Sequence, residues 1–166
     1  MVQMAITSAT SVNPAMIHVV AAEPDPGMAA RLRERARDDA RIEVVLTPAE
    51  RTPFADEAFD VVVSSLVLCT VDDLERSVAE IKRVLRPGGR LVFIEHVAAE
   101  KRFLRRLGQH VLEPLWKPLA GGCNLTRRSH EVIERAGFRF ESLTRDSMRG
   151  AMPVVRETVR GTARKP

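Results

Sequence analysis

Short apolar runs alternate with amphipathic segments from residue 17 onward, and this alternation limits the possible folds more than any other feature of the chain. The apolar runs predict buried strands, and segments with apolar residues three or four positions apart predict helices. Expected strands cover 17–22, 42–46, 59–64 and 90–96, and expected helices cover 28–37 and 74–85. Because helices that alternate with strands cover both faces of a parallel sheet, we predict an α/β fold that is Rossmann-like, doubly wound and mostly parallel.

The last third of the chain predicts a different ending for this sheet. A basic amphipathic helix is expected from Phe103, with a break near Pro114, because proline lacks the N–H that a helix interior needs. Another helix is expected between Thr126 and Gly137. The β-rich segments 138–143 and 154–163 would then form two closing strands, which add an antiparallel C-terminal edge strand to the parallel sheet.

Length and composition favour one compact unit. The 166 residues fit a single domain covering 1–166, and 45% hydrophobic residues suffice for a continuous core. The apolar runs are far shorter than the roughly 18 residues of a membrane helix, so we expect no transmembrane segment and a cytoplasmic location. Cys69 and Cys123 lie far apart without a zinc-site or disulfide spacing, which predicts reduced thiols and no metal.

The charge of the chain is unevenly distributed. Residues 1–100 carry 11 basic and 16 acidic side chains, and residues 101–166 carry 15 and 6, which together give a net charge of +4. A basic final third could attract nucleic acid or a lipid surface. Its arginines are scattered through amphipathic segments with few aromatic residues for base stacking, so we expect a solvated face and no nucleic-acid partner.

Several motifs follow the predicted strands. Glu23 directly follows the expected strand 17–22. A carboxylate just beyond a parallel strand can accept both hydroxyl hydrogens of a nucleotide ribose. The segments 47–50, 52–54, 64–69 and 83–91 (TPAE, TPF, SSLVLC and RVLRPGGRL) together resemble the methyltransferases of ubiquinone and menaquinone biosynthesis. The segments 95–98, 113–117 and 122–127 (EHVA, EPLWK and GCNLTR) are similar to the thiol methyltransferase branch of the methyltransferase-like proteins.

This resemblance to class I S-adenosylmethionine-dependent methyltransferases implies methyl transfer from S-adenosylmethionine to a small-molecule acceptor, possibly a thiol. Animal members of the branch carry an N-terminal membrane anchor, which is not expected here. The resemblance implies that Glu23 binds the ribose hydroxyls and that Met28 packs near the adenine. It also implies that Ala49 and Glu50 border the purine, and that Ser64 and Leu66 line the methionine end of the cofactor. Cofactor-binding positions carried over in this way are Glu23, Pro24, Met28, Ala49, Glu50, Ser64 and Leu66.

The acceptor side has two candidate residues. His96 would act as the catalytic base that takes a proton from a thiol or hydroxyl group, because its ordinary pKa of about 6.5 suits that task. The alternative is a strand-end histidine held by hydrogen bonds. Cys69 would face the acceptor as well, although a small buried core residue is the more common role of such a cysteine. Many relatives place an aspartate at the position of Pro48, where it accepts a hydrogen bond from the adenine amino group. Proline offers the adenine neither a carboxylate nor an N–H.

The N-terminal 16 residues depart from the family pattern. If segment 6–13 is aligned with the family's glycine-rich loop, Thr7, Ala9 and Ser11 replace its three glycines, whose missing side chains admit the cofactor. The loop is thus degenerate, or the chain is truncated. We predict that residues 2–6 form an abbreviated first strand between the expected strands 17–22 and 59–64. The absence of a first helix would uncover an apolar face of the sheet. A homodimer, or a non-catalytic remnant acting through self-association or a protein partner, is the alternative.

Overall fold

The computed structural model describes residues 4–8, 17–99, 103–148 and 150–166. These residues form one seven-stranded sheet in the order β3-β2-β1-β4-β5-β7-β6. The strands are β1 (Met4–Ser8), β2 (His18–Glu23), β3 (Ile42–Leu46), β4 (Phe59–Ser65), β5 (Leu85–His96), β6 (Arg139–Ser147) and β7 (Glu157–Arg164). The helices are α1 (Pro26–Ala36), α2 (Leu74–Val84), α3 (Phe103–Leu119) and α4 (Ser129–Arg135), with a short 3-10 turn at Pro153–Val155.

The expected α/β sheet is confirmed, including its antiparallel C-terminal end. β2 and β3 pair in parallel, as do β4 and β5, whereas β7 runs antiparallel to both β5 and β6. β6 forms the outer edge and β7 lies inside it. Two glycines permit the turn near the start of β5. Gly88 has a φ of 76°, and a Cβ at Gly89 would lie 2.8 Å from the Arg86 carbonyl oxygen.

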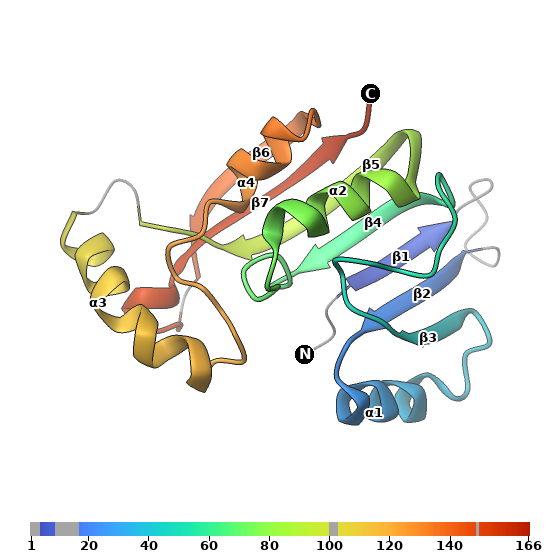
Figure 1. The fold of residues 1–166 in the computed structure, drawn as a ribbon, viewed down its shortest axis with the longest axis horizontal. Helices are drawn as coiled ribbons and strands as arrows, with labels where there is room; N and C mark the ends of the chain where they lie inside the picture. Colours follow the sequence, from blue (N-terminus) through green and yellow to red (C-terminus); the bar gives the residue numbers. More distant parts are fainter. Residues whose placement is uncertain (1–3, 9–16, 100–102, 149) are drawn as a thin grey trace.

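The first strand occupies the predicted slot between β2 and β4, but it runs in the unexpected direction. Met4 pairs with Ala22 and Ser64, and β1 is antiparallel to both neighbours. Its far end, Ser8, pairs with His18 at the start of β2. The two strands therefore form a hairpin, which Figure 1 shows between β3 and β4.

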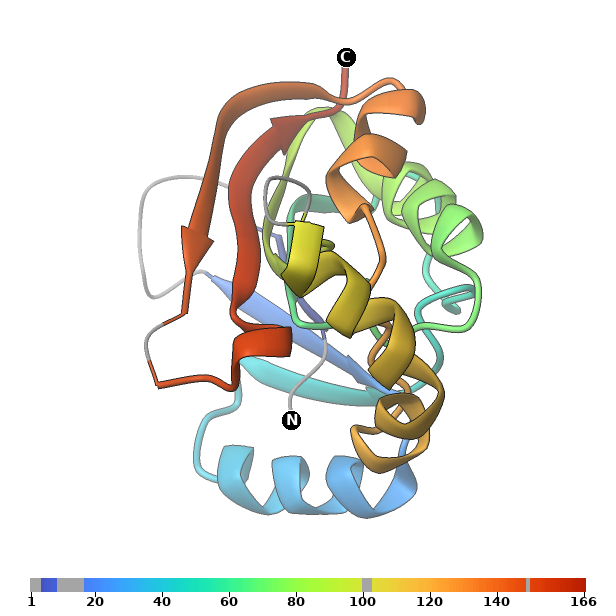
Figure 2. The same ribbon diagram turned by 90° about the vertical axis from the view of Figure 1, so that its left-hand side faces the viewer.

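Helices cover the two faces of the sheet unequally. α2 and α4 lie side by side over one face, α1 packs beside β2 and β3, and α3 lies near the ends of the central strands (Figures 1 and 2). Along β5, Leu91 and Phe93 are 0% and 2% exposed, whereas Val92 between them is 37% exposed. Among the described residues, the face that Val92 shares with Val63 thus carries no covering helix over the central strands.

Local sequence explains where α1 and α2 begin. Asp25 and Asp73 cap α1 and α2, because their side chains accept hydrogen bonds from the backbone N–H groups of Met28 and Arg76. The core cluster lies between α2 and the sheet, and the buried apolar face of α2 carries Leu74, Val78, Ile81 and Val84.

The expected break at Pro114 in α3 is wrong, since the helix continues through Pro114 and Pro118 to Leu119. Its side toward the molecule is polar: Gln109 is 1% exposed and holds the backbone of Val97, Ala99 and Val154. These hydrogen bonds fix α3 on the molecule independently of its apolar side chains.

Candidate active site

The carboxyl ends of β2, β3, β4 and β5 meet at one edge of the sheet, and two neighbouring cavities open there. Each has a volume of about 410 Å³, which is in the range of small-molecule sites. Thr70 and Gly121 line both cavities, so the two spaces adjoin. After the ligands that the sequence analysis predicts there, we call the space beside β2 the nucleoside cavity and the space beside β5 the acceptor cavity.

Glu23 gives the nucleoside cavity its main polar group. The residue is 2% exposed, and its Oε1 accepts a hydrogen bond from the Asp25 N–H at 3.0 Å. Its Oε2 is buried and has no hydrogen-bond partner in the described part of the chain. A buried carboxylate oxygen without a donor is costly, so this atom is prepared to accept a hydrogen bond from a bound molecule.

The opposite wall of the nucleoside cavity comes from the segment after β3. Pro48, Ala49 and Glu50 line it, and Met28 of α1 lines the side near Glu23. Oε1 of Glu50 accepts hydrogen bonds from the N–H groups of Asp72 and Asp73, at 3.0 and 3.4 Å. Glu50 therefore ties this wall to the start of α2.

The acceptor cavity is largely apolar. Its lining residues are Leu66, Cys69, Thr70, His96, Trp116, Leu119, Ala120, Gly121, Cys123 and Val155. Burial lowers the pKa of His96, although backbone groups of Val155 and Glu157 oppose this effect. Nδ1 of His96 is buried and unpartnered among the residues described. A neutral imidazole with a free ring nitrogen at a cavity wall can accept a proton from a bound acceptor.

A buried carboxylate, Glu95, holds the loop between the two cavities. It is 0% exposed, and its oxygens accept hydrogen bonds from the Ser64 hydroxyl at 2.7 Å and from the N–H groups of Val67 and Cys69 at 3.2 and 3.1 Å. Burial raises its pKa to about 7, against the lowering effect of these hydrogen bonds. Leu66, which begins this loop, has a φ of 58°, a strained conformation for a leucine.

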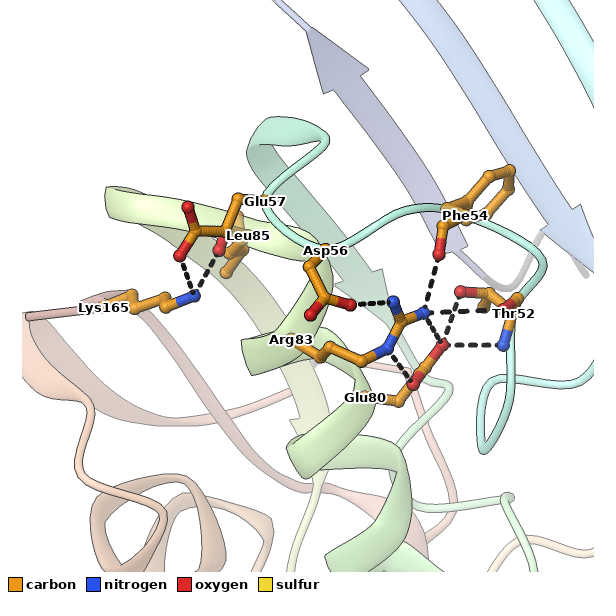
Figure 3. Close-up of polar contacts among 8 residues, drawn as sticks. All are labelled: Thr52, Phe54, Asp56, Glu57, Glu80, Arg83, Leu85 and Lys165. Atoms are coloured by element: carbon orange, nitrogen blue, oxygen red, sulfur yellow. Dashed lines mark hydrogen bonds and ion pairs between the residues drawn. The ribbon is translucent and has the colours of Figure 1, made fainter.

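A second polar cluster fixes the segment that follows the nucleoside cavity wall (Figure 3). Oε1 of Glu80 accepts hydrogen bonds from the N–H and hydroxyl of Thr52 at 2.7 and 2.6 Å. The Arg83 guanidinium donates to Glu80, to Asp56 and to the Phe54 carbonyl oxygen. Hydrogen bonds from Arg83 lower the pKa of Glu80 to about 2. The cluster thereby attaches residues 52–56 to α2.

The structure brings together most of the residues that the sequence singles out. Glu23, Pro24, Met28, Ala49 and Glu50 line the nucleoside cavity. Leu66, Cys69 and His96 lie together in the acceptor cavity.

Ser64 is not part of either group. It is 0% exposed, and its hydroxyl is used by Glu95 inside the molecule.

Thr7 is also remote from this edge, which corrects its alignment with a cofactor loop. It lies within β1 and pairs with Val19 and Val61, toward the opposite end of the sheet from Glu23. Ala9 and Ser11 lie outside the described residues.

Sequence reasoning assigned no role to Glu95, Trp116 or Cys123, which the structure places at the site. One signal for Glu95 was available. In the strand 90–96, positions 91, 93 and 95 share one face, so a glutamate there faces the same core as Leu91 and Phe93. Trp116 and Cys123 gave no such signal, because their place depends on how the segment after β5 folds back.

A doubly wound sheet is typical of proteins that bind a nucleotide and a second small molecule when a carboxylate with a free oxygen ends β2 beside an apolar cavity, as the described residues show here. The family model described as "Methyltransferase domain" matches residues 5–93. The chain therefore belongs to the class I S-adenosylmethionine-dependent methyltransferases, as the motifs predicted.

Individual proteins support this assignment. "Thiol S-methyltransferase TMT1A" from Homo sapiens is 54% identical over 84 residues, which are 51% of this chain and 34% of that protein. "Demethylmenaquinone methyltransferase" from Clavibacter sepedonicus is 37% identical over 100 residues, 60% of this chain and 41% of that protein. The chain thus spans well under half the length of either relative.

Solved structures agree with the fold. N-methyltransferase NodS from Bradyrhizobium japonicum WM9, solved in complex with S-adenosyl-L-homocysteine, superposes with a TM-score of 0.64 at 15% identity. The match covers 89% of this chain and 66% of that one.

Neither a metal cluster nor a membrane span is found in the part of the chain that the structure describes. Within residues 4–8, 17–99, 103–148 and 150–166, no three potential metal ligands gather, and no helix combines the length and hydropathy that a membrane span requires.

Proposed function

We propose that the chain is a methyltransferase that binds S-adenosylmethionine in the nucleoside cavity and methylates a small, largely apolar acceptor, with a thiol as the favoured class. The observation that carries this proposal is the unpartnered, buried Oε2 of Glu23 at the carboxyl end of β2. It is suited to accept a hydrogen bond from a ribose hydroxyl. S-adenosylmethionine supplies a methyl group that its sulfonium has already activated.

Each wall of the site has a task in this proposal. Glu23 holds the ribose, Met28 and Ala49 border the adenine, and Leu66 lines the adjoining acceptor cavity. The protein mainly aligns the two reactants and excludes water, because an activated methyl group needs no acid catalyst. The similarity to a human thiol S-methyltransferase and the apolar acceptor cavity support the thiol class.

His96 is the proposed base. Its lowered pKa keeps the imidazole neutral at neutral pH, and Nδ1 is buried at the cavity wall without a partner in the described residues. It would take the proton from the acceptor as the sulfur or oxygen attacks the methyl group. Cys69 is a poor alternative, because burial and its contacts raise the pKa of its thiol.

A matched pair of variants tests the nucleoside site. Glu23→Gln should weaken the binding of S-adenosylhomocysteine by about 10- to 100-fold, because it replaces a charged acceptor of a buried hydrogen bond by a neutral one. Glu34→Gln, an exposed position on α1, serves as control and should bind like the wild type. The readouts are calorimetric affinity and the shift of the melting temperature. Equal affinity of all three proteins would remove Glu23 from the site.

We also propose that two copies associate through α3. Leu104, Val111 and Leu115 on its outward side are 80%, 67% and 67% exposed. Such an apolar strip commonly lies against a partner, and a second copy offers a matching strip. Light scattering over a range of concentrations should show a mass above 18.5 kDa that falls in Val111→Glu. A monomer mass at every concentration would contradict self-association.

A further inference from the structure

The two cysteines of the chain, far apart in sequence, are neighbours in the acceptor cavity. Both line this cavity, Cys69 from the loop after β4 and Cys123 from the loop after α3. The backbone of the two loops is in direct contact, since the Asn124 N–H donates to the Cys69 carbonyl oxygen at 2.8 Å. The Asn124 side-chain amide donates to the same oxygen at 3.2 Å. The sequence contains no other cysteine.

Close packing keeps the two loops in this register. Gly122 has a φ of 89°, and a Cβ at this position would lie 3.1 Å from the Thr70 carbonyl oxygen. A side chain there would push the loops apart, so glycine permits the approach that brings the neighbouring Cys123 to Cys69. A hydrogen-bonding interaction between the two thiol groups shifts the pKa of each, and both thiols are free.

The environment distinguishes the two sulfurs. The hydrogen bond from Cys69 lowers the pKa of Cys123, and the Trp116 side chain acts in the same direction. The same hydrogen bond, together with burial, raises the pKa of Cys69, which is 0% exposed. Because the thiolate is the attacking species in exchange with disulfides, Cys123 is the sulfur suited to react first.

We propose that Cys69 and Cys123 form a reversible dithiol–disulfide couple in the wall of the acceptor cavity, with a small organic disulfide as the oxidant. The Cys123 thiolate attacks one sulfur of the disulfide, whose S–S bond breaks and releases the first thiol after protonation. Cys69 then loses its proton and attacks the Cys123 sulfur of this mixed disulfide, which releases the second thiol. One disulfide is reduced to two thiols, and the protein loses two hydrogens in forming the Cys69–Cys123 bond.

This couple goes beyond methyl transfer and does not require it. The new bond would join the loop after β4 to the loop after α3, and these loops supply Thr70 and Gly121, the residues that line both cavities. Oxidation therefore changes the wall that the cavities share. A disulfide of the same thiol class that the cavity is proposed to methylate would reach Cys123 through this cavity.

Intact-mass spectrometry and thiol counting test the couple on the full chain. Reduced protein is incubated with hydroxyethyl disulfide under native conditions. We expect a mass loss equal to two hydrogen atoms, a fall from two free thiols per chain to none, migration as a monomer on a non-reducing gel, and full recovery with dithiothreitol. Retention of both thiols, adducts without an internal bond, or disulfide-linked dimers would each overturn the proposal.

Two single variants test the order of attack. Cys69→Ser should stop at a mixed disulfide on Cys123, whereas Cys123→Ser should leave Cys69 unmodified over the same time. A faster adduct on Cys69 than on Cys123 would overturn the assigned order.

A comparison with unfolded protein tests the role of the fold. In urea, the two thiols are separated by 53 residues of flexible chain. The native protein should reach half-oxidation at an oxidant-to-thiol ratio at least about 10-fold lower than the unfolded chain. Equal ratios would show that the structure does not bring the sulfurs together.

Discussion

Glu95 is the residue whose environment has the clearest measurable consequence. Its carboxyl group is fully buried, and burial raises its pKa from 4.5 to about 7. The folded protein thus keeps a proton that the unfolded chain releases above about pH 4.5. The stability that this proton contributes is fully present below pH 4.5 and is lost as the pH rises through 7.

We expect the free energy of unfolding to fall by about 3 kcal/mol from this group as the pH rises from 4.5 to above 7. Glu95→Gln cannot ionise, so its unfolding free energy should lack this part of the pH dependence. Urea denaturation at several pH values measures it for the wild type, Glu95→Gln and the exposed control Glu34→Gln. Parallel curves for wild type and Glu95→Gln would show that burial does not shift this group.

At the residue scale, sequence reasoning succeeds where a residue's position follows from the end of its own strand. Glu23 and His96 end predicted strands, and both line the cavities. Sequence reasoning fails where a side chain at the end of a strand can face either the cavity or the protein interior. Ser64 follows the same rule as Glu23, yet its hydroxyl is bound by Glu95 from the neighbouring strand, and this partner was not assigned.

At the scale of single elements, helix α2 is held in place by a cluster of ion pairs as well as by its apolar face. Arg83 donates hydrogen bonds to Glu80, Asp56 and Phe54 (Figure 3). We expect Arg83→Met to lower the unfolding free energy by about 2 kcal/mol, because it leaves the half-buried Glu80 carboxylate with only Thr52 as donor. Arg76→Met, at an exposed position of the same helix, is the control and should change stability by less than about 0.5 kcal/mol. Equal effects of the two substitutions in chemical denaturation would contradict this role.

The same cluster predicts an acid dependence of opposite sign to that of Glu95. The pKa of Glu80 is lowered to about 2, so its contribution is present above its ordinary pKa of 4.5 and is lost as the pH falls toward 2. In Arg83→Met this acid-side loss should become smaller, since the first cause of the lowered pKa is absent. Denaturation curves between pH 2 and 5 measure the difference.

Elements with a strong local signal were predicted closely. The expected strand at 42–46 matches β3, and the Asp73 cap sets the start of α2. The end of α2 was placed one residue late, because Leu85 continues the apolar periodicity but already belongs to β5. α3 continues through Pro114 because His110, whose carbonyl oxygen loses its helical donor, is exposed and can be hydrogen-bonded by water.

The whole sheet is held together by the reversed first strand. The sequence pattern of a strand does not reveal its direction, because side chains alternate between the two faces of the sheet whichever way the strand runs. The connection length does reveal it: parallel neighbours need a crossover of a dozen or more residues, and fewer separate Ser8 from His18. A hairpin is the arrangement that this short connection permits. In it β1 still pairs with β2 on one side and with β4 on the other.

Hydrogen exchange tests whether β1 completes the sheet. Backbone amides of residues 4–8 should exchange at least about 100-fold more slowly than those of an unfolded peptide, because β1 pairs with β2 on one side and β4 on the other. Peptides from β4 provide an internal reference in the same mass-spectrometric experiment. Exchange of residues 4–8 at the unfolded rate would place the strand outside the sheet.

In the molecule as a whole, the carboxyl ends of β2, β3 and β4 meet at the edge of the proposed cofactor site, while β1 ends at Ser8, toward the opposite end of the sheet. The central claim is that the nucleoside cavity binds the cofactor from Glu23 and the segment after β3. Calorimetric titration of the wild-type chain with S-adenosylhomocysteine tests it most directly. The account predicts a saturable heat with one ligand per chain and a higher melting temperature; no heat and no melting shift at millimolar ligand would contradict it.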